Sequence, residues 1–220
     1  MLKLEEGLKL RFPGLAAPIV ILDGVTVEPE KPELQDFKRQ VEEEVRQKYD
    51  LETIKDAPLM RSYRDFYWKI GIDPTKDRPA AEALVRRILA GKSLPTINTL
   101  VDAYNLASVK GFIPMAAFDI EKIRGELIMR PALAEEKFLG IGMRAPQVLK
   151  GNEPVVSDSE KLVAIYPYRD ADSTKITLTT KKLLLMICGV PEVNLITLEE
   201  AMSVAVDFIT RFCGGSVVEV

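Results

Sequence analysis

Apolar residues recur with a helical period in the middle of the chain and with a strand period on either side of it. Four helices are predicted in the middle, one beginning at Pro32 and three covering residues 59–69, 79–90 and 96–110. After Phe118 the period falls from about 3.6 to about 2. This change predicts short strands at residues 126–130, 162–166, 175–179 and 183–188. Helices gathered between strands are typical of an α+β fold.

The two ends of the chain are predicted to add strands and one more helix. The first 28 residues predict two strands around the turn at Phe12–Gly14. A capping box at Thr197–Glu200 predicts the start of the last helix, and residues 217–220 are expected to return as an edge strand. Because no Gly-, Ser- or Pro-rich linker interrupts the sequence, we expect one domain over residues 1–220.

The clearest predicted helix covers residues 79–90. Pro79 suits the first turn of a helix, where its missing N–H would have no partner in any case. Glu82 and Arg86 stand four residues apart and are expected to pair on the outer face, and Gly91 ends the helix.

Composition excludes several classes of function. The 220 residues contain no histidine, which excludes a Ser-His-Asp triad, a Cys-His pair and any histidine-ligated metal. Two cysteines cannot form a tetrahedral zinc site alone, so we expect no metal and no cofactor. The net charge of −3 argues against coating nucleic acid, although a local patch could still grip one end, and no DNA partner is expected. No apolar run is long enough to span a membrane, and we expect a cytoplasmic location.

Three polar residues of the helix at 96–110 form the first candidate site. Asn98, Asp102 and Asn105 are spaced by four and three residues and line one face, while Ile97, Val101 and Tyr104 line a neighbouring face expected to be core. The polar face is either simply solvated or holds a loop or a ligand. Asparagine is a poor helix former, and an ordinary exposed face favours Lys and Glu.

Two further candidates lie in the strand-rich part. Asp119 precedes a predicted helical turn and is either the N-cap of that turn or part of a pocket. Arg169 and Asp170 end a strand, and Thr174 and Thr177 follow them with hydroxyl groups. Arginine suits a phosphate or a carboxylate because its planar fork can bind in two places, but a structural Arg–Asp pair is an equally good interpretation.

Basic and aromatic residues alternate at residues 61–69. Such a composition can stack nucleic-acid bases, but Tyr63, Phe66 and Tyr67 share one helical face, which favours core packing. The chain contains no phosphate-binding glycine loop and no nucleophile elbow.

From Tyr67 to about Thr180 the sequence resembles the tRNA-binding and editing domain of the phenylalanyl-tRNA synthetase beta chain, and most of all its freestanding members. The segments that carry the resemblance are Gly71–Pro74, Arg78–Leu84, Arg86–Gly91, Leu94–Pro95, Val101–Asn105, Phe118–Asp119, Gly125–Arg130, Tyr168–Asp170 and Thr174–Thr177. The resemblance implies an α+β fold of layered helices and mixed or antiparallel sheets. It also implies a family-like core at about 60–180, with flanking elements at 1–58 and 181–220.

The resemblance also implies a pocket that hydrolyses tyrosine wrongly attached to phenylalanine tRNA. Asn105 matches the asparagine of the synthetase pocket. The pocket histidine of the synthetase falls at Ala116, and the glutamate that meets the tyrosine hydroxyl falls within Leu183–Ile187, which holds no acid. The amino acid recognised is therefore expected to differ from tyrosine.

Two functions follow from this resemblance. In the first, the protein hydrolyses the ester of a mischarged aminoacyl-tRNA in trans, with Asn105 orienting water or the terminal ribose hydroxyl and Arg169 holding the terminal phosphate or ester. In the second, it is a non-catalytic module that binds a tRNA end or a free amino acid. The residues expected to complete the binding site are Asn98, Asp102, Asp119, Arg130, Asp170, Thr174 and Thr177.

Overall fold

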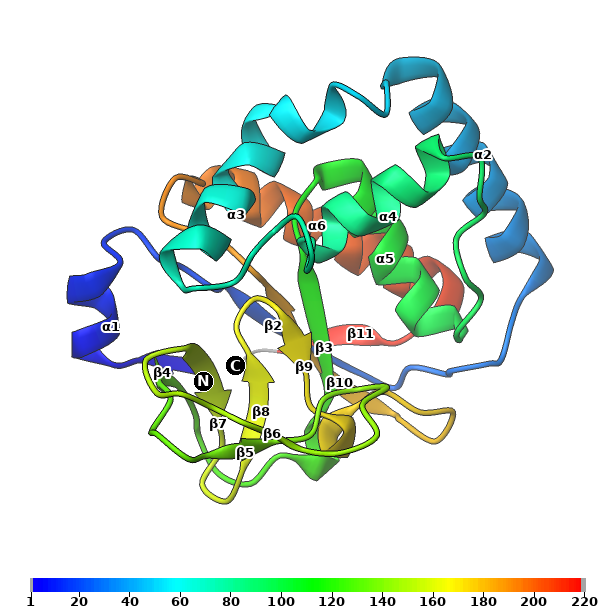
Figure 1. Cartoon of the computed structure of the whole chain (residues 1–220). Helices are drawn as coiled ribbons and strands as arrows, with labels where there is room; N and C mark the ends of the chain where they lie inside the picture. The colour runs from blue at the N-terminus through cyan, green and yellow to red at the C-terminus, as the bar shows by residue number, and fades with distance from the viewer. Residues whose placement is uncertain (1, 219–220) are drawn as a thin grey trace.

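The computed structural model describes residues 2–218, which form two larger sheets, a two-stranded ribbon and a group of helices (Figure 1). The helices are α1 (Glu6–Arg11), α2 (Pro32–Lys48), α3 (Pro58–Lys69), α4 (Ala80–Leu89), α5 (Thr99–Gly111) and α6 (Leu195–Cys213), with 3-10 turns at Ile54–Asp56, Ile120–Lys122 and Asp172–Thr174. The strands are β1 (Leu2–Leu4), β2 (Ile19–Asp23), β3 (Met115–Asp119), β4 (Leu127–Pro131), β5 (Lys137–Phe138), β6 (Gln147–Val148), β7 (Pro154–Ser157), β8 (Leu162–Ile165), β9 (Arg169–Asp170), β10 (Lys182–Ile187) and β11 (Ser216–Val218). None of the helices within these residues is long and apolar enough to cross a membrane.

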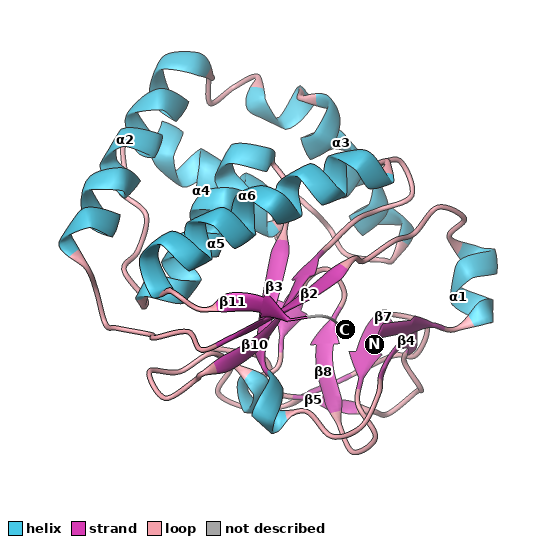
Figure 2. Cartoon of the chain, turned by 180° about the vertical axis from the view of Figure 1, so that it is seen from behind, coloured by secondary structure: helices cyan, strands magenta, loops and turns pink. Residues whose placement is uncertain are grey.

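The fold has a helical side and a strand-rich side. Helices α2 to α6 gather over the four-stranded sheet, whose strand order is β11-β2-β10-β3, and the five-stranded sheet lies on the other side with α1 (Figure 2). The five-stranded sheet has the order β1-β4-β7-β8-β9, and β5 and β6 form a separate ribbon. The structure thus confirms the α+β class with layered helices and mixed sheets.

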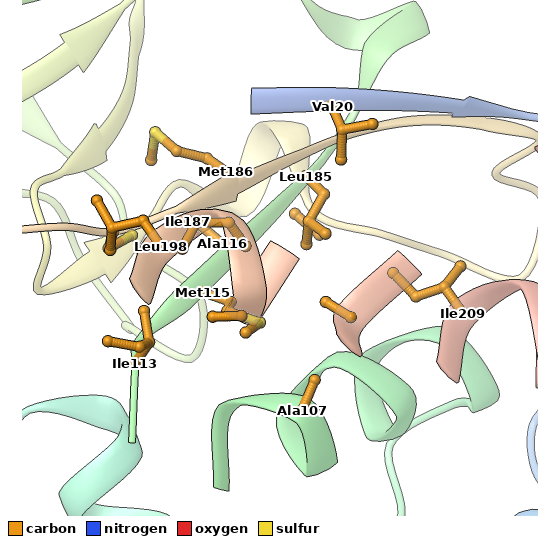
Figure 3. Close-up of a cluster of buried hydrophobic side chains, with 14 of the residues drawn as sticks. Val20, Ala107, Ile113, Met115, Ala116, Leu185, Met186, Ile187, Leu198 and Ile209 are labelled. Carbon is orange, nitrogen blue, oxygen red and sulfur yellow. The ribbon is translucent and has the colours of Figure 1, made fainter. Parts of the chain in front are cut away.

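Strand β10 lies between two other strands of its sheet, and from Leu183 to Ile187 its side chains are apolar on both faces. It pairs antiparallel with β2 on one edge and with β3 on the other. Leu185 and Met186 leave the strand in opposite directions, with Leu185 on the side of the helices that carry Ala107 and Ile209 (Figure 3). Both side chains are buried, as expected for a strand covered on both faces.

Two buried tyrosines tie the segment after β10 to other parts of the fold. The Tyr63 hydroxyl on α3 donates to the Cys188 carbonyl at 2.6 Å, and the Tyr166 hydroxyl after β8 donates to the Gly189 carbonyl at 2.5 Å. A side chain at Gly189 would collide with the Ala16 carbonyl oxygen and with Leu198, so only glycine fits there. The ends of β8 and β10, which belong to different sheets, are therefore held together.

A buried ion pair connects α2 to the start of α5. The Lys38 ammonium donates to the Asp102 carboxylate at 2.8 Å, and both side chains are less than 5% exposed. Asp102 also accepts from the Ile97 N–H at 3.0 Å, and Asn98 caps the helix by accepting from the Val101 N–H at 2.9 Å. These bonds satisfy polar groups at a helix start that would otherwise lack partners.

The structure confirms the helices predicted in the middle of the chain to within three residues at each predicted boundary. The capping box at Thr197–Glu200 was wrong, because the C-terminal helix begins at Leu195 and its N-cap is Asn194, three residues before Thr197. The predicted strand at 175–179 is also wrong, since this segment follows a 3-10 turn and turns again before β10. Within residues 216–218 the predicted edge strand is confirmed, and residues 219–220 lie outside the described part.

Two predictions failed because the pairing partners are distant in sequence. The first 28 residues do not form a strand pair, because β1 pairs in parallel with β4 and β2 belongs to the other sheet. Helix α1 occupies the segment between them. Glu82 does not face solvent beside Arg86: it is fully buried and pairs with Arg64 of α3 at 2.9 Å.

Replacing Lys38 with Met should lower the free energy of unfolding by about 3–5 kcal/mol, because Asp102 would remain charged and buried without its cation. The control is Lys110→Met, which removes a partly exposed pair with Glu44 and should lower it by less than about 1 kcal/mol. Urea unfolding of both variants checks this. Equal losses would show that the buried pair has no special role.

Candidate functional site

Two hollows meet at the β8–β9 hairpin. The first, which we call the inner pocket, has a volume of about 80 Å³ and lies between the end of β10, the start of β3 and β9. The second, which we call the basic groove, has a volume of about 620 Å³ and runs along α4. Ala80, Tyr168 and Arg169 line both, so the groove and the pocket adjoin at these three residues.

The basic groove carries a strong excess of positive charge. Its only acid among the lining residues is Asp77, and its cations are Lys76, Arg78, Arg86, Arg87, Lys92 and Arg169. The side chains of Arg78 and Lys92 are exposed and make no hydrogen bond or ion pair within residues 2–218. Cations without protein partners along a groove attract an anionic ligand, and guanidinium groups suit phosphate.

The floor of the inner pocket is apolar where the resemblance would place an imidazole and an acid. Ala116 of β3 pairs in register with Met186 of β10, and both are nearly fully buried. Within Leu183–Ile187, Met186 alone lines the pocket. A polar group at the end of a ligand side chain would find no partner on this floor.

Arg169 is held at the junction of the two hollows. Its guanidinium lies over the Tyr168 ring, 5.0 Å from the ring centre, and donates to the Ile141 carbonyl at 3.2 Å. Tyr168 in turn donates its hydroxyl hydrogen to Asp77 at 3.1 Å. A side chain at Gly140 would collide with Arg169, so the close approach requires glycine. The resulting order means that a ligand meets a positioned arginine and an aromatic face.

Asp170 follows Arg169 on β9 and lines the inner pocket but not the groove. It is half-buried. Burial raises the pKa of Asp170 from its ordinary value to about 7. Burial also raises the pKa of Cys188, and the charge of Asp170 raises it further, so this thiol is protonated at neutral pH. Burial also raises the pKa of Tyr104 on α5, and the charge of Asp170 raises it further.

The polar face of α5 separates into structural and unpartnered residues. The Asn98 side chain caps the helix, and the Asp102 side chain forms the ion pair with Lys38 described above. Asn105 is half-buried, and its side chain makes no hydrogen bond within the described residues. On the neighbouring face, Ile97 is 54% exposed, so the prediction of a core position there was wrong.

The remaining predicted residues lie away from the inner pocket. Asp119, at the far end of β3, caps a 3-10 turn through the Glu121 N–H and accepts from the Thr180 hydroxyl at 2.8 Å, and Thr177 belongs to the same hydroxyl cluster. Arg130 forms a two-point ion pair with Glu136 at 2.7 and 3.0 Å. Thr174 is buried, and its hydroxyl has no partner within residues 2–218. The predicted residues that line the inner pocket are therefore Arg169 and Asp170.

Sequence reasoning missed the basic groove although a signal for it exists. The signal is local basic density, since Lys76, Arg78, Arg86, Arg87 and Lys92 flank or lie on one helix. Of these, only Arg86 was given a place from the sequence, beside Glu82 on the outer face. No group of three or more acid, cysteine or histidine side chains within residues 2–218 is close enough to hold a metal ion.

Comparison with known proteins places this chain next to synthetase beta subunits. The family described as the B3/4 domain matches residues 62–215. The phenylalanine–tRNA ligase beta subunit of Fusobacterium nucleatum is 32% identical over 112 residues, which cover 51% of this chain and 14% of that protein. The corresponding subunit of a Wolbachia strain of Brugia malayi is 27% identical over 124 residues, which cover 56% of this chain and 16% of that protein. The chain thus matches only a small part of the length of these relatives.

The fold is also similar to a solved structure. An N-terminal fragment of the phenylalanyl-tRNA synthetase beta subunit from Pyrococcus horikoshii aligns with 99% of this chain and 50% of its own, with a TM-score of 0.53 and 16% identity. At that identity the likeness concerns the fold.

Replacing Asp170 with Asn should stabilise the protein at pH 8 but not at pH 4. The raised pKa means that the folded state holds a proton that the unfolded state loses, so wild-type stability falls as the pH rises from about 4 to about 7. Asparagine mimics the protonated acid and removes this loss. Asp172→Asn, at a partly exposed residue paired with Lys175, is the control. Thermal unfolding across pH 4–8 checks the difference, and parallel curves for wild type and Asp170→Asn would contradict it.

Proposed function

The chain belongs to the B3/4 domain family, and on that premise we propose that it hydrolyses the ester bond of a mischarged aminoacyl-tRNA in trans. The observation that carries the proposal is that the basic groove adjoins the inner pocket, with Tyr168 and Arg169 lining both. An aminoacylated acceptor end has the matching form: a single strand of phosphates that ends in a small amino acid. A cytoplasmic location is part of the same proposal.

The groove would hold the phosphates of the acceptor end. Its unpartnered cations, Arg78 and Lys92, lie on the surface where a single strand could reach them. Tyr168 offers an aromatic face at the junction, and such faces stack on bases in single-stranded nucleic acid. Local charge explains how a chain of net charge −3 could bind RNA.

The inner pocket would hold the amino acid. The buried pair of Ala116 and Met186 offers no hydrogen bond to a phenol, so tyrosine has no advantage over an apolar side chain. The pocket, at about 80 Å³, is far smaller than the groove, at about 620 Å³, which suits a single side chain in the pocket and the strand in the groove. We therefore propose a small or apolar amino acid as the one removed. An editing site sorts its substrates by such a difference in pocket chemistry.

Hydrolysis would depend on positioning rather than on a protein nucleophile. The pKa of the Cys188 thiol is raised, which leaves it a poor nucleophile. Arg169 would hold the terminal phosphate or the ester. Asn105 is not among the residues that line either hollow, and its proposed role, to orient the attacking water or a ribose hydroxyl, rests on the resemblance and on its side chain having no partner among the described residues. Orientation alone can supply much of the rate increase for an activated ester.

A non-catalytic binding module is the second candidate. The apolar floor of the pocket and the protonated Cys188 thiol favour it, since neither offers reacting chemistry. Such a module would bind the acceptor end or a free amino acid without cleaving an ester.

A deacylation assay on correctly and wrongly charged tRNAs should show hydrolysis of one class of mischarged tRNA. Arg169→Ala should lower kcat/KM by roughly 100-fold, because a charged contact to the reacting group is lost, and Asn105→Ala should lower kcat by at least about tenfold. The control is Arg130→Ala, which breaks the Glu136 pair away from the pocket. If the whole panel is bound but none is hydrolysed, the protein is a binding module.

The salt dependence of tRNA binding tests the groove separately. The double variant Arg78→Gln, Lys92→Gln should reduce the log–log salt slope by about 1.4, because each single-strand phosphate contact contributes about 0.7. The matched control removes two exposed lysines outside the groove, Lys137 and Lys181, and should leave the slope unchanged. Equal slopes for the two double variants would remove the groove from the proposal.

A further inference from the structure

Asp170 is half-buried and, unlike the fully buried acids of residues 2–218, has no cation. Each fully buried carboxylate within residues 2–218 lies within 4 Å of a lysine or arginine: Glu42 with Arg46, Glu82 with Arg64, Asp102 with Lys38, Asp119 with Lys122 and Asp158 with Lys161. The side chain of Asp170 makes no ion pair and no hydrogen bond to any described residue. It lines the inner pocket.

The groups that surround Asp170 do not supply a positive charge. Tyr104 approaches from α5 and Cys188 from the end of β10, and both are neutral at pH 7 because burial raises the pKa of each. Arg169 precedes Asp170 on β9, but its guanidinium is directed to Tyr168 and to the Ile141 carbonyl. The carboxylate therefore lines the pocket without a paired cation.

An unpaired carboxylate in such a place is costly unless a ligand supplies the missing cation. Burial raises the pKa of Asp170 to about 7, which is what the missing cation predicts. A ligand with an ammonium group would restore the charge pairing seen at the other buried acids.

We propose that Asp170 binds the α-ammonium group of the amino acid held in the inner pocket. The inference rests on the proposed function, since an aminoacyl ester carries an ammonium on the carbon next to its carbonyl. Arg169 and Asp170 then divide the aminoacylated end by charge. Arg169, which lines both hollows, would meet the phosphates, and Asp170, which lines the pocket alone, would meet the ammonium. The substrate class is an aminoacyl ester with a free α-ammonium group, and an ester of an N-acylated amino acid is rejected.

Binding of small probes tests this role without any catalytic step. The probes are L-alaninamide, L-valinamide and L-methioninamide, which carry an ammonium but no carboxylate, together with their N-acetyl derivatives. Met115 and Met186 line the inner pocket, so methyl NMR of protein labelled at its seven methionines reports occupancy directly. At least one amide should shift the Met186 methyl signal, and its N-acetyl derivative should bind at least about tenfold more weakly.

Asp170→Asn should weaken the same amide by at least about tenfold, while Asp172→Asn leaves its affinity unchanged. Asp170→Glu, which keeps the charge, should recover part of the binding. The inference is overturned if no amide binds, if acetylation has no effect, or if Asp170→Asn binds like wild type. The stability expected of Asp170→Asn at pH 8 separates loss of binding from loss of folding.

Deacylation measured beside binding separates this inference from the proposed function. Suppose that the protein hydrolyses a mischarged tRNA at a rate that neither N-acetylation of the amino acid nor Asp170→Asn changes. This result would overturn the ammonium role of Asp170 and keep the deacylase. Ammonium-dependent binding at Asp170 with no hydrolysis of any tRNA would keep the role of Asp170 and overturn the deacylase.

Discussion

Two tyrosine hydroxyls fix the end of the central strand β10. Tyr63 of α3 and Tyr166, after β8 of the other sheet, donate to the consecutive carbonyls of Cys188 and Gly189, directly after β10. Both phenols are fully buried, so a shift of α3 or of either sheet would leave a buried donor and a buried acceptor unpaired. Because Tyr166 and Cys188 also line the inner pocket, the bonds that join the sheets set the shape of the pocket.

Charge is distributed around this junction in three parts. The floor at Ala116 and Met186 carries none, the groove along α4 is strongly positive, and Asp170 is a single carboxylate between them. A ligand that satisfies all three parts needs an anionic strand, an ammonium and an uncharged side chain. Those are the features of an aminoacylated acceptor end, which is why the proposed function and the role of Asp170 support each other.

Local pattern was enough for the helices but not for the pairings. The helix at 80–89 follows from its apolar spacing, whereas Glu82 was misplaced because its partner Arg64 lies 18 residues away on another helix. Likewise Asp102 meets Lys38 across 64 residues. The inner pocket joins the ends of strands that are far apart in sequence, so little of its lining could be predicted. Arg169 and Asp170 were found from their place at the end of a strand, and Ala116 only from the resemblance.

The most direct test of the account is a crystal structure with a short acceptor-end oligonucleotide that carries an amide-linked amino acid. The account predicts the amino acid in the inner pocket against Met186, its ammonium on Asp170, and phosphates along the groove beside Arg78. An amino acid that points into solvent, or a strand bound outside the groove, would contradict it.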